Sequence, residues 1–210
     1  GRNADDYFNN LQPLISKIVY MPAPGNHEYM PIIGDNGANF QNRFKVPSGN
    51  NDYYTFAIGR IRFIIISTEI YYAMETPRRF WRTKKMIDWL YNVMKHANNN
   101  RDKQPWVVVV GHRPLYCTSS KPCRCTNGST FVRKGFKNFG RYFGITPLED
   151  VLYETGVDLV FSGHNHHYER TLPVYNHQFA LKLQLLNSSA SDPYFNPKAS
   201  VYIVTGAAVC

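Results

Sequence analysis

The sequence predicts an α/β fold in which buried strands alternate with helices. Two observations carry the prediction: short runs of β-branched and aromatic residues that end in polar loops, and amphipathic stretches between them with apolar residues three or four apart. Nearly continuous apolar runs are typical of strands in a sheet that helices cover. We therefore expect an α/β sandwich whose loops after the strands converge along one sheet edge.

Six segments have the pattern of strands. The apolar runs at 18–21, 106–110 and 157–161 each lead into a loop that carries histidine, asparagine or glycine. The runs at 53–58 and 61–67 are joined by Gly59-Arg60, which predicts a hairpin. A last short strand is expected at 201–204.

Helices are expected between these strands. Residues 80–97 form an amphipathic stretch in which Trp81 would face the core, and 6–16 form a shorter one. Thr146 and Glu149 have the spacing of a capping box at the start of a further helix, and Gly156 is placed to end it. The cations at 78–85 are interleaved with aromatic residues, a pattern that nucleic-acid binding also produces, but on this helix they would form a solvated rim.

Composition limits the class of protein. The 210 residues are 43% hydrophobic and 19% charged, too apolar for a disordered chain. No run reaches the ~18 apolar residues of a membrane span, and the length fits one large domain, 1–210, or at most two. The net charge of +9 would attract anions such as phosphate esters, nucleic acid or a membrane surface, without choosing among them.

Cysteines and glycosylation sequons bear on the compartment. Four cysteines are compatible with two disulfides, a zinc site or free thiols, although the spacing of Cys123 and Cys125 is unusual for zinc. Asn127 and Asn187 begin acceptor sequons in polar, turn-rich stretches. Together these features favour an oxidising, secretory compartment.

Two of the loops that follow predicted strands carry candidate metal ligands. In Gly25-Asn26-His27-Glu28, the Asn26 amide oxygen is a neutral hard donor, and His27 could hold or protonate a phosphate oxygen. His112 follows four consecutive valines and Gly111. Each feature alone is more typical of an ordinary turn or of a hydrogen-bonded histidine.

The third loop has two histidines. His164 and His166 are two residues apart, so in an extended segment both would point toward one metal ion or two adjacent ions. Gly163 is expected to let the backbone turn without a Cβ in the way. Alone, this is a histidine-rich surface turn, but three such loops at one sheet edge favour a dinuclear metal site.

Taken in order, GNHE at 25–28, VGH at 110–112, GHNH at 163–166 and YER at 168–170 resemble the purple acid phosphatase branch of the metallophosphoesterases. The resemblance covers essentially the whole chain and implies a four-layer α/β/β/α sandwich. It also implies a centre with one iron ion plus zinc, iron or manganese, whose bound hydroxide attacks phosphorus. By the same resemblance, Asn26, His112 and His164 bind the divalent ion, His166 binds trivalent iron, and His27 contacts the phosphate and assists the leaving group.

The first two ligand blocks of that family, an Asp-x-Gly and a Gly-Asp-x-x-Tyr, do not occur upstream of Gly25. Asp5 and Asp6 have the wrong spacing to replace them, and we interpret both as solvated carboxylates. We therefore expect a partial catalytic domain that is truncated at its N-terminus and just past Cys210.

The leading hypothesis is a secreted, extracellular or lysosomal acid phosphatase that acts on small phosphate monoesters, with Arg113 as a further phosphate contact. Neither nucleic acid nor a membrane span is expected, and the oligomeric state stays open. Two alternatives remain: a related phosphodiesterase or nucleotide phosphatase, and a truncated non-catalytic form that binds anions or a partner. A basic nucleic-acid-binding module is the third choice.

Overall fold

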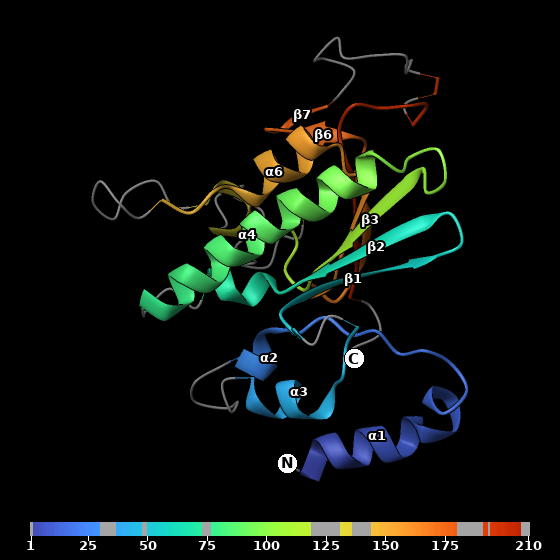
Figure 1. Cartoon of the computed structure of the whole chain (residues 1–210), viewed down its shortest axis with the longest axis vertical. Coiled ribbons are helices and arrows are strands. Elements are labelled where there is room, and N and C mark those ends of the chain that lie inside the picture. The colour runs from blue at the N-terminus through green and yellow to red at the C-terminus, as the bar shows by residue number, and fades with distance from the viewer. Residues whose placement is uncertain are drawn as a thin grey trace.

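A six-stranded mixed sheet forms the centre of the fold (Figure 1). The structure, a computed structural model, describes residues 2–29, 37–47, 50–72, 77–118, 131–135, 144–179, 191–192 and 194–206. Within these residues no helix is long and apolar enough to cross a membrane.

The strands run in the order β1-β2-β3-β4-β8-β5. The inner strands are parallel, and the edge strands β1 and β5 are antiparallel to their neighbours. This confirms the α/β class and the hairpin at Gly59, which has φ 56°. The strands are β1 (Tyr53–Ile58), β2 (Ile61–Ile66), β3 (Trp106–Val110), β4 (Leu159–Ser162), β5 (Tyr168–Arg170) and β8 (Val201–Thr205), with a separate hairpin of β6 (Val174–Tyr175) and β7 (Gln178–Phe179).

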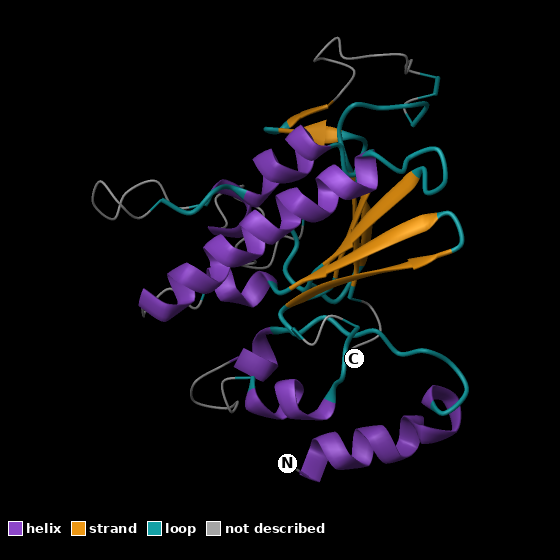
Figure 2. Cartoon of the chain, in the orientation of Figure 1, coloured by secondary structure: helices purple, strands orange, loops and turns teal. Residues whose placement is uncertain are grey.

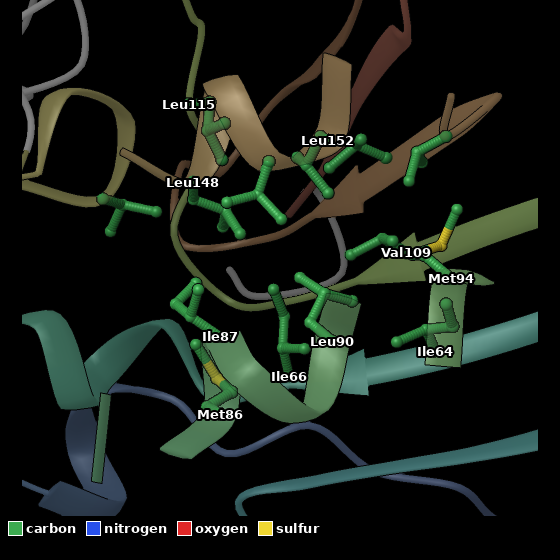
Figure 3. Close-up of a cluster of buried hydrophobic side chains, with 14 of the residues drawn as sticks. Ile64, Ile66, Met86, Ile87, Leu90, Met94, Val109, Leu115, Leu148 and Leu152 are labelled. Atoms are coloured by element: carbon green, nitrogen blue, oxygen red, sulfur yellow. The ribbon is translucent and has the colours of Figure 1, made fainter. Parts of the chain in front are cut away.

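Helices cover one face of this sheet (Figure 2). The two that pack on it, α4 and α6, lie against each other, and their apolar side chains meet those of the inner strands (Figure 3). Leu90 of α4 and Leu148 of α6 are fully buried there together with Val109 of β3. The helices are α1 (Arg2–Ile15), α2 (Asn26–Tyr29), α3 (Ala38–Arg43), α4 (Pro77–Asn98), α5 (Phe131–Lys134), α6 (Leu148–Thr155) and the 3-10 helix η1 (Thr68–Tyr71).

The opposite sheet face is also apolar. Side chains alternate along strands, so Phe63 and Phe161, out of phase with the helix-facing positions, line this second face. Both are half-buried, whereas Ile65 on the same face is fully buried beside Met21 and Ala23. The described residues therefore form two of the four predicted layers, one of helices and one sheet. The second face of this sheet is apolar, as expected where a further layer would pack.

The strand predicted at 18–21 does not form. Residues 19–25 are irregular, and Val19 is 75% exposed. Met21 of this segment instead packs on the second sheet face, in the cluster with Tyr54 and Ile65. β-propensity reflects packing against neighbouring strands, and no strand pairs with this run in the described residues.

The predicted capping box is also wrong. Pro147 is the N-cap residue of α6 and makes no side-chain capping bond. Glu149 is buried and accepts from Arg133 and Tyr116 instead, because a buried charge-assisted pair outweighs a backbone cap. The predicted end of the helix is correct, since Gly156 caps it with φ 73°.

The prediction that Trp81 faces the core is wrong, since this residue is 53% exposed. The buried stripe of α4 runs from Met86 through Leu90 to Met94. At about 100° per residue, Trp81 falls roughly 170° from the centre of that stripe. The cations are not all a solvated rim either, since Arg82 forms an ion pair with the buried Asp52.

A buried hydroxyl in the strand end after β2 gives a first test of the fold. Ser67 is fully buried, and its Oγ has no hydrogen-bond partner among the described residues. Ser67→Ala is expected to raise the free energy of unfolding by about 1 kcal/mol, because an unsatisfied buried hydroxyl is costly. Thr68→Val should lower it, since the Thr68 hydroxyl accepts from the Arg113 amide at 2.8 Å. Urea unfolding measures both, and a loss of stability in Ser67→Ala would contradict the assignment.

Candidate metal centre

The first arm of the site is the single helical turn α2. It follows Gly25, whose amide donates to Glu28 Oε2 at 2.8 Å and so closes the turn at its beginning. Asn26 is its first residue and His27, which is exposed, its second. Tyr29 ends the turn and is buried.

The three side chains predicted to bind the divalent ion converge. Asn26 Oδ1 lies 2.7 Å from His112 Nε2 and 3.3 Å from His164 Nδ1, and the two histidine nitrogens are 3.1 Å apart. Three donors that each lie about 2.0–2.2 Å from a tetrahedral metal are separated by roughly 3.4 Å, so this triangle needs little opening to hold one. The donor set, two imidazoles and one amide oxygen, therefore fits a divalent ion. We call these three residues the Asn26–His112–His164 triad.

Close packing holds the second arm. His112 follows β3, and the nearest atoms of its ring would lie 3.0 Å from a Cβ on Gly25. A Cβ on Gly111 would come within 2.9 Å of Thr68 Cγ2. The glycines of these two loops are thus required by the approach of neighbouring side chains.

The third arm differs from the prediction. His164 has φ 63°, in the left-handed region, so the loop is not the extended segment on which the shared direction of His164 and His166 was based. His166 is exposed and supplies none of the three converging donor atoms. The reason predicted for Gly163 is also wrong, because a Cβ there would meet nothing nearer than 3.8 Å.

No group of three or more histidine, cysteine, aspartate or glutamate side chains that could hold a metal occurs among the described residues. The triad contains only two such residues, since its third donor is the amide of Asn26. Asp5 and Asp6 are exposed, as predicted, and Asp5 pairs with Arg43 at 2.6 Å.

Burial keeps the triad histidines neutral. It lowers the pKa of His112 to about 3, aided by His164 and Arg113, and the pKa of His164 to about 4, aided by Arg113 and His166. A neutral imidazole is the form that binds a metal. Both side chains are thus in the ligand form even in mildly acidic solution.

Arg113 lies beside the triad, where Glu69 and Tyr72 hold its guanidinium through contacts that the sequence did not predict. Its Nε donates to both carboxylate oxygens of Glu69, at 2.8 and 3.0 Å, and its guanidinium lies 4.0 Å from the Tyr72 ring centre. Its Nη1 is 3.5 Å from His164 Nε2. Burial raises the pKa of the Glu69 carboxyl, which Arg113 opposes. The only sequence signal was the position of Ser67-Thr68-Glu69 after a strand.

The remaining predicted residues have different outcomes. Asn127 and Asn187 lie outside the described residues, as do Cys123 and Cys125. Cys117 is disulfide-bonded. His167, next to the predicted ligand His166, has its Nε2 3.2 Å from Glu169 Oε2.

Two glycine variants test the packing of the triad. Gly25→Ala is expected to weaken binding of a divalent ion about tenfold, since the new Cβ must displace the His112 ring by a few tenths of an ångström. Gly163→Ala, in the facing loop, should change the affinity little because its Cβ has room. Zinc titration monitored by calorimetry compares the two variants. Equal losses in both would show that close approach at Gly25 is not what positions His112.

The lowered pKa values also predict how stability depends on pH. In the metal-free chain, the imidazoles of His112 and His164 take up protons near pH 6.5 when unfolded but only near pH 3–4 when folded. The unfolded state therefore gains protons first, and the free energy of unfolding should fall as the pH decreases from about 6.5 toward 4. Urea unfolding with a chelator at pH 7, 6 and 5 measures this slope. A double variant His112→Asn, His164→Asn should show a shallower slope, and an unchanged slope would contradict the shifts.

Comparisons with known proteins identify the relatives of this chain. The family profile of the calcineurin-like phosphoesterases matches residues 1–168. The chain is 37% identical over its whole length to mouse acid phosphatase type 7 and 36% identical to the human protein, and it covers 44% of each. It also resembles the structure of the purple acid phosphatase PPD1 from yellow lupin seeds, with a TM-score of 0.66 and 25% identity over 97% of this chain and 33% of that one. The chain thus spans less than half the length of these relatives.

Proposed function

We propose a metal-dependent phosphatase function on the premise that the chain belongs to the calcineurin-like phosphoesterase family. The observation that carries the proposal is the convergence of Asn26, His112 and His164 from three separate loops onto one point. The full-length similarity to acid phosphatase type 7 supports phosphate esters as the substrate class. The complete protein would hydrolyse phosphate monoesters in mildly acidic solution.

The proposed cofactor is an iron ion together with zinc, iron or manganese. When bound, such a pair supplies Lewis-acid activation of water and of the phosphoryl oxygens. The triad would hold the divalent ion, and His166 would contribute to the iron site. Both triad histidines remain neutral ligands near pH 5 because burial lowers their pKa values.

The chain's other residues would bind the substrate and move a proton. His27, which is exposed next to Asn26, would donate a proton to the oxygen of the leaving group. Arg113 is held through its Nε by Glu69, so its Nη1 atom is presented toward the His164 side of the site. A guanidinium fixed in this way is suited to neutralise a phosphate oxygen.

A second function deserves a test because the described residues supply no carboxylate to the triad. In this alternative the chain binds anions or a partner without catalysis. The predicted secretory compartment, based on the cysteines and on the sequons at Asn127 and Asn187, is compatible with either function and remains a proposal.

The decisive experiment is hydrolysis of 4-nitrophenyl phosphate by the chain after incubation with iron and zinc. Turnover that is lost in His164→Ala and on chelation would support a phosphatase, and bis(4-nitrophenyl) phosphate in parallel would detect a preference for diesters. A chain that binds metal and phosphate but shows no turnover would favour the non-catalytic alternative.

A further inference from the structure

We propose that Asp52 is a positioning residue that holds two arms of the candidate metal centre together, an inference that rests on the proposed function. Its side chain contacts the Asn26 arm, and its backbone is linked to the His112 arm by way of Ser67 and Thr68. We call the set of Tyr29, Asp52, Arg82 and the Ser67 amide the Asp52 bridge. None of these residues belongs to the triad itself.

The side-chain half of the bridge fixes the end of α2. The Tyr29 hydroxyl donates to Asp52 Oδ1, while Arg82 donates to Asp52 Oδ2 through Nε, at 3.1 Å, and through Nη2. Gln41 Nε2 lies 3.3 Å from both the Tyr29 oxygen and Asp52 Oδ1. Burial and Asp52 raise the pKa of Tyr29 to about 12, so its hydroxyl remains a donor across the physiological range. The Asp52 carboxylate thus accepts from side chains of α2, α3 and α4.

The backbone half reaches the other arm. The Asp52 carbonyl accepts from the Ser67 amide at 2.6 Å. Ser67 precedes Thr68, whose hydroxyl accepts from the amide of Arg113 at 2.8 Å. Arg113 directly follows His112, so three consecutive links join Asp52 to the loop that carries this triad ligand.

The bridge matters because α2 cannot hold Asn26 in place alone. A single turn of four residues is far below the length at which an isolated helix is stable. Tyr29 is three residues after Asn26 and therefore on the same side of the turn. Anchoring Tyr29 on Asp52 fixes the turn that carries Asn26 Oδ1 at 2.7 Å from His112 Nε2. Metal sites lose affinity when their supporting contacts allow shifts of about 1 Å.

An ordinary ion pair would only stabilise the fold, and the chain contains one for comparison. Arg101 pairs with Asp158, which also accepts from the Val107 amide at 2.7 Å. Like Asp52, Asp158 pairs with an arginine and joins it to the sheet, although the Asp158 side chain is 29% exposed and that of Asp52 11%. It lies at the start of β4, at the opposite end of that strand from the His164 loop. Asp158→Asn is therefore the matched control.

The test uses the metal-free chain and long-range 1H–15N spectra of the histidine rings. Asp52→Asn and the milder Tyr29→Phe are expected to shift the ring nitrogen signals of His112, because the Asn26 oxygen moves away from Nε2. His96, which is exposed near the end of α4, serves as the internal reference. Asp158→Asn should lose stability without moving the His112 signals. Unchanged His112 signals in both bridge variants, or an equal change in Asp158→Asn, would overturn the proposal.

Zinc affinity provides the second measurement. Supporting residues of metal ligands typically account for 10–100-fold in affinity, so Asp52→Asn and Tyr29→Phe should weaken zinc binding by that order and Asp158→Asn should not. Tyr29→Phe removes one hydroxyl and keeps the aromatic ring, so it tests the bridge even if Asp52→Asn does not fold. The spectral response in a chain that shows no hydrolysis would keep the bridge and reject phosphatase activity of this chain alone. Hydrolysis that neither variant affects would keep the phosphatase and reject the bridge.

Discussion

Replacing His164 by alanine is expected to weaken binding of a divalent ion by the chain at least about a hundredfold. Even residues that only support a ligand cost 10–100-fold, and His164 supplies one of the three converging donor atoms. Its loss leaves Asn26 and His112 2.7 Å apart as a two-donor site. Hydrolysis by the complete protein should fall with the metal, which activity assays and metal analysis of the same sample measure together.

His96→Ala is the control, because it removes an exposed imidazole whose hydrogen-bond partner in the described part of the chain is Asn100, just past the end of the same helix. His112→Ala should behave as His164→Ala does. His27→Ala should instead abolish most activity while leaving the metal content intact, since His27 is exposed beside the triad and supplies none of its donor atoms. Retained activity in all three variants would end the phosphatase hypothesis, and a loss of metal in His27→Ala would assign His27 to the ligands.

The parts of the fold that the sequence predicted are those set by local periodicity. The valine run of β3 and the helix-period pattern of α4 depend on residues close in the chain, and both formed where expected. The segment 18–21 has the same apolar character but no partner strand in the described residues. A strand depends on its neighbours, and a single run cannot reveal them.

The site was predicted only as far as topology allows. Parallel strands end at one edge, so the loops that carry His112 and His164 had to meet. The left-handed conformation of His164 has no comparable signal, because glycine next to it was the more obvious residue for a turn. Asp52 had no sequence signal and Glu69 only its position after a strand, since their side-chain contacts join positions 11 to 44 residues apart.

The largest loss of stability is expected when a buried ion pair between α5 and α6 is broken. Arg133 and Glu149 are almost fully buried, and Arg133 Nη1 donates to Glu149 Oε2 at 2.7 Å. Arg133→Met would leave the carboxylate buried without its cation, which costs about 3–5 kcal/mol. Urea unfolding should show this loss, whereas Asp88→Asn in the exposed pair with Lys84 should cost at most about 0.5 kcal/mol.

The double variant Arg133→Met, Glu149→Gln separates the charge from the hydrogen bonds. Glu149 Oε1 also accepts from the Tyr116 hydroxyl and, at 2.8 Å, from the Asn176 amide, and a glutamine oxygen can accept both. The double variant should therefore recover most of the stability that Arg133→Met loses, because no unpaired charge remains buried. A double variant as unstable as the single one would mean that packing of the Arg133 side chain, or its 2.5 Å contact with His177 Nε2, stabilises this region instead.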